Sequence, residues 1–410
     1  MDARGATRYA CRMSTRRNIA IIGAGPAGLM AAEILAAAGH AVHVLDRMPS
    51  PARKLLIAGR GGLNLTHSEP LETFLTRYGP AADWLAPAIR AFPPDALRAW
   101  CDGLGGETFI GSSGRVFPKQ MKAVGLLRAW LKRLEQLGVQ YHPRHTWLGW
   151  EGDELRFATS TGEIYVAPDA TLLALGGASW PRLGSDGGWV KLLEAQGIPI
   201  APLQPANCGF LTPWSDVIRA RFAGQPLKPL AITHAGVTRQ GEAMITAQGI
   251  EGGVIYAFSA SIRDAIARDG KTTVTLDLRP GMAVKMLRSK LAARGSKSLG
   301  AFLRGAGFSP LAIALLHETT PDASTIPDPA ARLKSLPLTL TGTAGIARAI
   351  STAGGIPRDA LDAHYMLKAR PGLFAAGEML DWEAPTGGYL LQACFSTAHA
   401  AAQGMLAYLG

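Results

Sequence analysis

The segment from Asn18 to Asp46 constrains the fold of this chain more than any other. It opens with the apolar, β-branched run Ile19-Ala20-Ile21-Ile22, which is typical of a buried parallel strand. The loop Gly23-Ala24-Gly25-Pro26-Ala27-Gly28 follows, and then come a helix-forming stretch from Leu29 to Ala38 and a second strand from Ala41 to Leu45. Strand, glycine loop, helix, strand and terminal acid, in this order, predict a Rossmann-like α/β unit that binds a dinucleotide.

Each part of this segment suits a dinucleotide. Gly23 can make the tight turn, Gly25 lets the backbone approach a pyrophosphate, and Gly28 lets the helix pack closely on the strand. The helix N-terminus offers N–H groups and a positive dipole end to the phosphates, and Asp46 can accept hydrogen bonds from a ribose. A purely structural glycine turn is the alternative. The residues predicted to contact the dinucleotide here are Gly23, Gly25, Pro26, Ala27, Gly28, Asp46 and Arg47.

Composition narrows the class of protein. With 410 residues, 48% of them hydrophobic and 18% charged, the chain has room for two or three domains of a globular enzyme. It contains no apolar run of the length that crosses a membrane. Its four cysteines, Cys11, Cys101, Cys208 and Cys394, are scattered without any CxxC pair, which argues against disulfide reductases and metal sites and favours the reducing cytoplasm.

The net charge of +11 is divided between the N-terminus and the rest of the chain. Residues 1–17 hold five arginines and one aspartate and are predicted to form a disordered basic tail, with an organellar transit peptide as the alternative. The remaining charge is expected to be spread over a solvated surface, as at Arg128, Lys132 and Arg133 on one helix. Binding of RNA or of anionic substrates is the alternative interpretation of this charge.

A second glycine-rich segment runs from Arg53 to Thr66. Its glycines are flanked by cations, and the loop follows the strand that ends on Asp46, so it can fold back over the nucleotide. The alternative is a flexible surface turn. The residues predicted to bind the cofactor here are Lys54, Gly59, Arg60, Gly61, Gly62, Asn64 and Leu65.

The middle of the first domain, from about residue 71 to residue 177, is predicted to contain helices followed by short strands. A helical region from Leu71 to Trp100 precedes a turn that places Arg115 between two short strands, and a helix from Lys122 to Leu137 ends at Gly138. Four strand candidates are predicted to form a small antiparallel set: Val139–Tyr141, Thr146–Trp150, Glu154–Thr159 and Ile164–Val166. A further buried strand, Thr171–Leu175, leads into Gly176 and Gly177, at the edge where open α/β sheets bind ligands.

The pattern of predicted secondary structure changes between residues 198 and 345. Strands alternate with glycine turns, and short helices replace them between about 280 and 336. We therefore predict an inserted β-rich substrate or lid domain with a helical subdomain, placed within an FAD-binding domain made of residues 18–197 and 346–410.

The C-terminal part again shows the pattern of a nucleotide-binding domain, a buried strand followed by glycines and a helix. The strand Leu373–Ala376 ends on Gly377 and Glu378, and Gly387 and Gly388 precede the last helix, which begins at Tyr389 and Leu390. A carboxylate in this position can hold a ribityl hydroxyl. A helix N-terminus can stabilise the negative charge of a reduced flavin.

Taken together, these strings resemble the YhiN and BaiN type of FAD-binding oxidoreductase, also called the aminoacetone oxidase family, within the glutathione-reductase-like superfold. The resemblance runs from Ile19 to Gln403 and includes GAGPAG, GRVFP at 114–118, LGGASWPRLGSDG at 175–187, GEAMITAQGIEG at 241–252, TAGGI at 352–356 and LFAAGEMLDWEAPTGGYLLQA at 373–393. One loop departs from the pattern. The family's SGGGRCNxTN reads AGRGGLNLTH here, with Arg60 displaced and Leu63 in place of a cysteine.

The resemblance implies non-covalent FAD bound by these segments, with the inserted domain closing over the flavin ring. It favours hydride transfer through flavin N5 to or from a small organic molecule. Alternatives are an RNA-acting flavoprotein similar to tRNA-modifying enzymes, and a flavin-binding protein without turnover. With one dinucleotide loop, NADH or NADPH is expected only as a transient electron donor.

No catalytic acid or base stands out in the sequence. Arg60, Arg115 and His67 are candidates by placement alone. We expect a monomer or weak homo-oligomer, no membrane association and no nucleic-acid partner.

Overall fold

The computed structural model describes residues 16–292, 295–320 and 326–410. The prediction of a disordered tail over residues 1–17 falls almost entirely outside the described residues. The segment that carries the glycine loop forms β1 (Asn18–Ile22), α1 (Pro26–Ala37) and β2 (Ala41–Asp46), in the predicted order.

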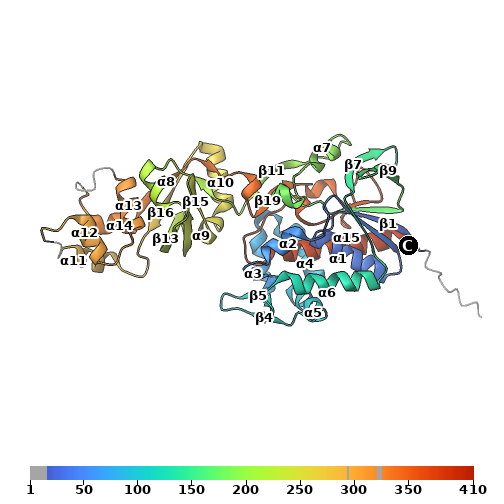
Figure 1. Ribbon diagram of the computed structural model, residues 1–410, viewed down its shortest axis with the longest axis horizontal. Helices are drawn as coiled ribbons and strands as arrows, with labels where there is room; N and C mark the ends of the chain where they lie inside the picture. Colours follow the sequence, from blue (N-terminus) through green and yellow to red (C-terminus); the bar gives the residue numbers. More distant parts are fainter. Residues whose placement is uncertain (1–15, 293–294, 321–325) are drawn as a thin grey trace, which may run out of the picture.

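These strands belong to a five-stranded parallel sheet. Its strand order is β20-β10-β1-β2-β6, with β10 at Ala170–Leu173, β20 at Leu373–Ala375 and β6 at Gln140–Pro143. The apolar residues of β1 are buried, and α1 packs against the last helix, α15 (Tyr389–Leu409), in the same lobe (Figure 1). The predicted Rossmann-like α/β class is therefore confirmed.

One strand was assigned to the wrong sheet by the sequence analysis. The segment around Val139–Tyr141 was expected in the small antiparallel set, but β6 lies parallel to β2 at the edge of the main sheet. Helix α6 (Ala123–Gln136) precedes β6, and Gly138, with φ of +80°, turns the chain after it. The antiparallel set itself contains β7 (Thr146–Glu151), β8 (Glu154–Thr159) and β9 (Gly162–Val166).

The second glycine-rich segment begins with a short helix, α2 (Arg53–Ala58), which the sequence analysis treated as loop. The chain then forms β3 (Thr66–His67), which joins β5 (Arg115–Pro118) and β4 (Thr108–Ile110) in a three-stranded antiparallel sheet. The predicted helical region between these strands contains α3 (Leu71–Leu75), α4 (Ala82–Ala91) and α5 (Pro94–Asp102).

A second hydrophobic core lies between Cys208 and Ala349. It is built on a seven-stranded sheet of order β17-β16-β13-β14-β15-β12-β18, whose paired strands are antiparallel. The strands are β12 (Phe210–Leu211), β13 (Pro226–His234), β14 (Val237–Ile245), β15 (Gly249–Glu251), β16 (Thr272–Asp277), β17 (Leu336–Leu340) and β18 (Gly342–Thr343). The helices of this core are α8 (Asp216–Phe222), α9 (Gly253–Tyr256), α10 (Ser259–Asp269), α11 (Val284–Ala292), α12 (Leu299–Gly305), α13 (Pro310–Glu318) and α14 (Pro329–Lys334).

Two strands lie where the chain passes between the cores. β11 (Ala201–Ala206) pairs antiparallel with β19 (Ser351–Gly355), so the outgoing and returning segments run side by side, as Figure 1 shows between the two lobes. The first core contains buried residues up to Ile198 and again from Ile356. The division into domains at residues 197/198 and 345/346 stays a prediction.

Candidate functional site

A cavity of about 810 Å³ opens at the carboxyl ends of β1, β2 and β10. Open α/β sheets place their ligands at this edge, and the volume lies within the range of about 300–1,000 Å³ found for small-molecule sites. All of the lining residues lie between 22 and 192 or between 350 and 394. Residues 198–345 contribute none of them.

The three glycines of the first loop, Gly23, Gly25 and Gly28, have different physical roles here. Gly23 has φ of +108°, and a Cβ added there would lie 2.3 Å from the Ala174 carbonyl oxygen. A Cβ at Gly28 would lie 1.9 Å from the Gly23 carbonyl oxygen. A Cβ at Gly25 would meet no atom within 4 Å, yet this residue lines the cavity. Gly23 and Gly28 are therefore required by the fold, whereas Gly25 leaves open the space beside the N-terminus of α1.

Asp46 holds the glycine loop against the end of β2. Its Oδ2 accepts a hydrogen bond from the Ala24 amide at 2.7 Å, and its Oδ1 accepts one from the Met48 amide at 2.7 Å. Burial raises the pKa of this carboxyl, and the two amide hydrogen bonds counteract the effect. The carboxylate thus lies at the cavity with lone pairs still available for the hydroxyls of a ribose.

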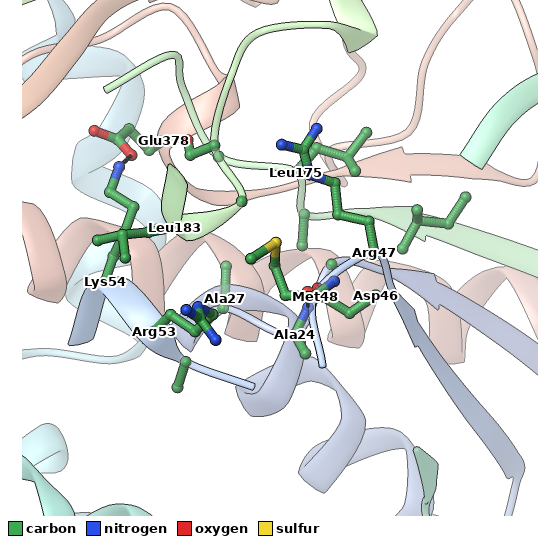
Figure 2. Close-up of a pocket in the computed structure, with 18 of the residues that line it drawn as sticks. Ala24, Ala27, Asp46, Arg47, Met48, Arg53, Lys54, Leu175, Leu183 and Glu378 are labelled. Atoms are coloured by element: carbon green, nitrogen blue, oxygen red, sulfur yellow. Dashed lines mark hydrogen bonds and ion pairs between the residues drawn. The ribbon is translucent and has the colours of Figure 1, made fainter. Parts of the chain in front are cut away.

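Lys54 and Glu378 meet at the opposite end of the cavity (Figure 2). Lys54 Nζ donates to Glu378 Oε2 at 2.8 Å and to Ser179 Oγ at 2.9 Å. Glu378 Oε1 accepts from the Thr352 amide at 3.1 Å. This partly buried pair joins α2 to the end of β20 and places a fixed cation and a fixed carboxylate side by side.

Arg53 lies between these two ends, beside Ala27 in Figure 2. Its Nη1 donates to Ser50 Oγ at 3.2 Å, but its buried Nε has no hydrogen-bond partner among the described residues. The buried Nε1 of Trp147, which also lines the cavity, likewise has none within the described part of the chain. The buried Nε of Arg156, another lining residue, is also without a hydrogen bond in the described part of the chain. Since buried donors are normally paired, unpaired donors gathered in one cavity indicate that a ligand with acceptor atoms belongs there.

The predicted cofactor-binding residues divide into two groups. Those that line the cavity are Gly23, Gly25, Pro26, Ala27, Asp46, Arg47, Lys54, Gly176, Glu378 and Leu390. Those that do not line it are Gly28, Gly59, Arg60, Gly61, Gly62, Asn64, Leu65, Gly177, Gly377, Gly387, Gly388 and Tyr389. Gly28 and Gly177 are tightly packed, because a Cβ on Gly177 would lie 2.3 Å from Thr352 Oγ1.

The loop that contains Gly59 to Leu65 lies against α6 and β5. A Cβ on Gly59 would lie 2.5 Å from Ala123 Cβ, and the Leu65 amide donates to the Val116 carbonyl. The next residue, Thr66, packs directly against Gly388, where a Cβ would lie 2.5 Å from Thr66 Cα. The loop is therefore beside the start of α15 rather than among the residues that line the cavity around the glycine loop.

None of the three catalytic candidates lines the cavity. Arg60 and Arg115 are exposed. His67 accepts a hydrogen bond from the Glu69 amide on Nδ1, and its Nε2 lies 3.0 Å from the Ser113 carbonyl oxygen. This pairing assigns the proton to Nε2 and uses both ring nitrogens within the fold, so His67 is placed as a structural residue.

Several cavity residues were missed by the sequence analysis. They include Met48, Arg53, His145, Trp147, Trp180, Asp186, Ser351, Trp382 and Cys394. Arg53 stood beside the chosen Lys54, and the sequence held no signal to prefer one cation over the other. Arg47 Nη1 pairs with Asp186 Oδ2 at 2.5 Å across the cavity, a contact between residues 139 positions apart that local patterns do not reveal. Burial raises the pKa of the Cys394 thiol to about 12, so this thiol stays protonated.

No helix in residues 16–292, 295–320 and 326–410 is long and apolar enough to cross a membrane. Within the same residues, no group of three or more histidine, cysteine, aspartate or glutamate side chains could hold a metal ion.

Comparison with known proteins places this architecture in a family. The description "HI0933-like protein Rossmann domain" matches residues 17–404. The chain is 26% identical over 411 residues to the 3-dehydro-bile acid delta(4,6)-reductase of Clostridium scindens, covering 93% of this chain and 97% of that protein. It is 25% identical over 415 residues to the ribosomal RNA dihydrouridine synthase of Escherichia coli, covering 94% and 97%.

Among solved structures, the fold is similar to that of 3-ketosteroid-delta4-(5alpha)-dehydrogenase from Rhodococcus jostii. The TM-score is 0.50 at 15% identity, covering 98% of each chain. This likeness concerns the fold alone. The chain belongs to the HI0933-like family of Rossmann-domain proteins and is an FAD-dependent oxidoreductase.

Proposed function

We propose that the FAD lies along the cavity with its adenosine near Asp46 and Arg47, its pyrophosphate at Gly25 and Arg53, and its ring near Lys54 and Glu378. Three features support this order. Asp46 offers acceptors for a ribose, the N-terminus of α1 and Arg53 offer donors and positive charge for phosphates, and Leu390 lines the cavity at the start of α15. The unpaired Arg53 Nε carries most weight, because it is a buried cationic donor beside the glycine loop.

The substrate class that we propose is a carbon–carbon double bond conjugated to a carbonyl group. Two relatives that match over nearly their whole length support this class, because a 3-dehydro-bile acid delta(4,6)-reductase and a ribosomal RNA dihydrouridine synthase are both named for products of such a reduction. FAD, once reduced by an electron donor, would supply the hydride from its N5 and return to the oxidised form, and a proton from solvent would complete the saturation of the double bond. Lys54 would favour negative charge on the neighbouring ring, and its bond to Glu378 holds it in place.

An anaerobic reoxidation experiment tests this proposal. The purified holoprotein is reduced with light and a sacrificial donor, and the flavin absorbance is followed after addition of 4-en-3-one steroids, simple enones or uridine. Rapid reoxidation by at least one conjugated compound, with the saturated product found by mass spectrometry, is the expected result. Reduction of the oxidised flavin by amines, without any reaction of enones, would instead indicate an amine oxidase.

A second candidate is reduction of a base in RNA, and the distribution of charge favours it. Residues 198–345 carry 16 lysines and arginines against 9 aspartates and glutamates, whereas residues 18–197 and 346–410 together carry 21 of each. Outside the first 17 residues, the whole excess of +7 is therefore in the inserted segment. The count therefore assigns the excess positive charge to one segment of the chain. A basic lobe beside a neutral lobe is the pattern that attracts a polyanion.

The two candidates differ in how binding responds to salt. Binding of an RNA substrate should weaken steeply between 50 and 200 mM salt, because each phosphate neutralised by the protein makes the binding constant more dependent on salt concentration. Binding of a small neutral enone should not depend on salt in this way. Titration of fluorescent ribosomal RNA fragments at several salt concentrations, with a DNA duplex as comparison, makes the measurement. If neither the small compounds nor RNA reoxidise the reduced flavin, the result would favour the third alternative, a flavin-binding protein without turnover.

A further inference from the structure

A cluster of buried polar contacts joins the inserted segment to the start of the last helix. Asn207 follows β11, has a left-handed backbone with φ of +51°, and is 3% exposed. Its Nδ2 donates to Ser351 Oγ and to the Ala384 carbonyl oxygen, both at 2.8 Å, and its Oδ1 accepts from the Thr386 amide at 3.2 Å. The Ala384 carbonyl can only accept and the Thr386 amide can only donate, so the orientation of the carboxamide is fixed.

A charged pair lies next to this amide. Arg263, on α10, is 8% exposed and binds Glu383 through both Nη atoms, at 2.8 and 3.0 Å. Its Nη1 also donates to the Pro205 carbonyl oxygen at 3.3 Å. Ser259 at the start of α10 accepts a hydrogen bond from the Cys208 amide at 3.1 Å, which ties this helix to the residue after Asn207. A buried, two-pronged arginine pair fixes both direction and distance, as a lysine would not.

The segment held by these contacts leads directly into the start of α15. It runs from Glu383 to Thr386 and is flanked by Trp382 and Leu390, which line the cavity. Gly387 and Gly388 follow with φ of +136° and +97°, and glycines in such conformations restrict the chain little by themselves. The position of the helix N-terminus must therefore be set by contacts on either side of the glycines. After the glycines, Thr66 packs on Gly388 and the side chains of Tyr78 and Glu69 bind Tyr389. Before the glycines, Asn207 and Arg263 hold the segment 383–386.

We propose that Asn207 and Arg263 are positioning residues through which the inserted domain sets the N-terminus of α15 against the ring of FAD. This inference rests on the proposed placement of the ring near Lys54 and Glu378, in the cavity that Leu390 also lines at the start of α15. The positive end of a helix stabilises the negative charge that a flavin gains on reduction. When the segment 383–386 is loosened, the reduced flavin loses part of that stabilisation, so the midpoint potential becomes more negative and FAD is released faster.

Matched variants test the proposal. Arg263→Gln removes the buried pair. Arg268→Gln removes the same charge from the same helix, where Arg268 is exposed and forms hydrogen bonds and an ion pair only with Asp269 among the described residues. Asn207→Asp keeps a residue that tolerates the left-handed backbone but places an acceptor against the Ala384 carbonyl. Glu383→Gln keeps the size of the side chain and serves if Arg263→Gln does not fold.

The measurements are the flavin midpoint potential, by equilibration with reference dyes, and the rate of FAD release, by recovery of FAD fluorescence. We expect Arg263→Gln, Asn207→Asp and Glu383→Gln to shift the potential to more negative values and to release FAD about tenfold faster, with Arg268→Gln unchanged. A wild-type potential and release rate in a folded Asn207→Asp or Glu383→Gln variant would overturn the inference. Neither measurement uses a substrate. The positioning role of Asn207 and Arg263 can therefore be tested even if the proposed reaction with enones is not observed.

Discussion

At the scale of single residues, the glycines of the first loop separate binding from folding. Gly25 lines the cavity, and a side chain there would meet no protein atom within 4 Å, whereas a Cβ at Gly28 would lie 1.9 Å from the Gly23 carbonyl oxygen. We expect Gly25→Val to abolish FAD binding while the melting temperature of the apoprotein changes little. Gly28→Ala should instead destabilise the fold by about 1–3 kcal/mol, as overpacking usually does.

The FAD content per chain after gel filtration and the thermal melting curve check both expectations. The wild type should be yellow and should release intact FAD on denaturation. Colour that stays with the precipitated wild-type protein would contradict non-covalent binding. A yellow Gly25→Val variant would contradict the placement of the pyrophosphate.

Arg53 gives the second prediction at this scale. Because its buried Nε lacks a partner among the described residues, Arg53→Met should leave the apoprotein as stable as the wild type. Loss of a charged hydrogen bond to a phosphate should weaken FAD binding by about 10- to 100-fold. Titration of apoprotein with FAD, followed by flavin fluorescence, measures the change. Arg60→Met is the control, because Arg60 does not line the cavity. If Arg60→Met weakens FAD binding as much as Arg53→Met does, the positive charge of the segment matters rather than a direct contact of Arg53.

At the scale of secondary-structure elements, the sequence predicted where strands lie better than which strands pair with one another. The short, continuous apolar runs and the glycines that follow them located β1, β2, β10 and β20 to within two residues. The same patterns could not say that β6 lies beside β2, because pairing depends on the crossover through α6 and not on the strand's own residues. Likewise, the glycines after Ala58 hid the short helix α2, which places Lys54 and Arg53 on the cavity.

The junction of β3 with α15 carries a pH-dependent contribution to stability. Glu69 accepts two hydrogen bonds from Arg77 and one from the Tyr389 hydroxyl, and these contacts lower the pKa of its carboxyl below the ordinary value of 4.5. A carboxyl with a lowered pKa in the folded state stabilises the fold fully above pH 4.5. This contribution is lost as the pH falls through the folded-state value.

Glu69→Gln should therefore lower the free energy of unfolding at pH 7 by about 1 kcal/mol, a small figure because Arg77 is partly exposed to solvent. The difference from the wild type should shrink below pH 4.5. Urea unfolding between pH 3 and pH 7 makes the comparison. A difference that does not change with pH would show that the charge of Glu69 contributes nothing at this junction.

At the scale of the whole molecule, the sequence predicted a nucleotide-binding part and an inserted part, and the structure shows two separate hydrophobic cores. It did not predict how the parts are joined, because Asn207, Arg263 and Glu383 carry no motif and meet only through the fold. Nor did it predict that the cavity is lined from one side alone, with no residue of 198–345 among its walls. The substrate is therefore expected to approach through space that the inserted domain borders without filling the cofactor cavity.

The last prediction concerns the source of electrons. The pattern GxGxxG, joining a parallel strand directly to a helix, occurs once in the described residues, at Gly23, Gly25 and Gly28, and the second core is built on an antiparallel sheet. A nicotinamide dinucleotide thus has no second site of this kind and must reach the flavin through weak, transient contact. We expect anaerobic reduction of the bound flavin by NADH or NADPH to be slow and to saturate only near or above about 1 mM.

Stopped-flow absorbance at increasing concentrations of each dinucleotide makes the measurement. Dithionite reduction of the same sample shows that the flavin is accessible to electrons, and a chain freed of FAD serves as the blank. Fast, stoichiometric reduction at micromolar NADH or NADPH would require a dedicated nicotinamide site, which would have to lie outside the single glycine loop. A slow reaction would instead favour an electron donor that delivers its electrons directly at the flavin edge, because such a donor needs no second nucleotide-binding fold.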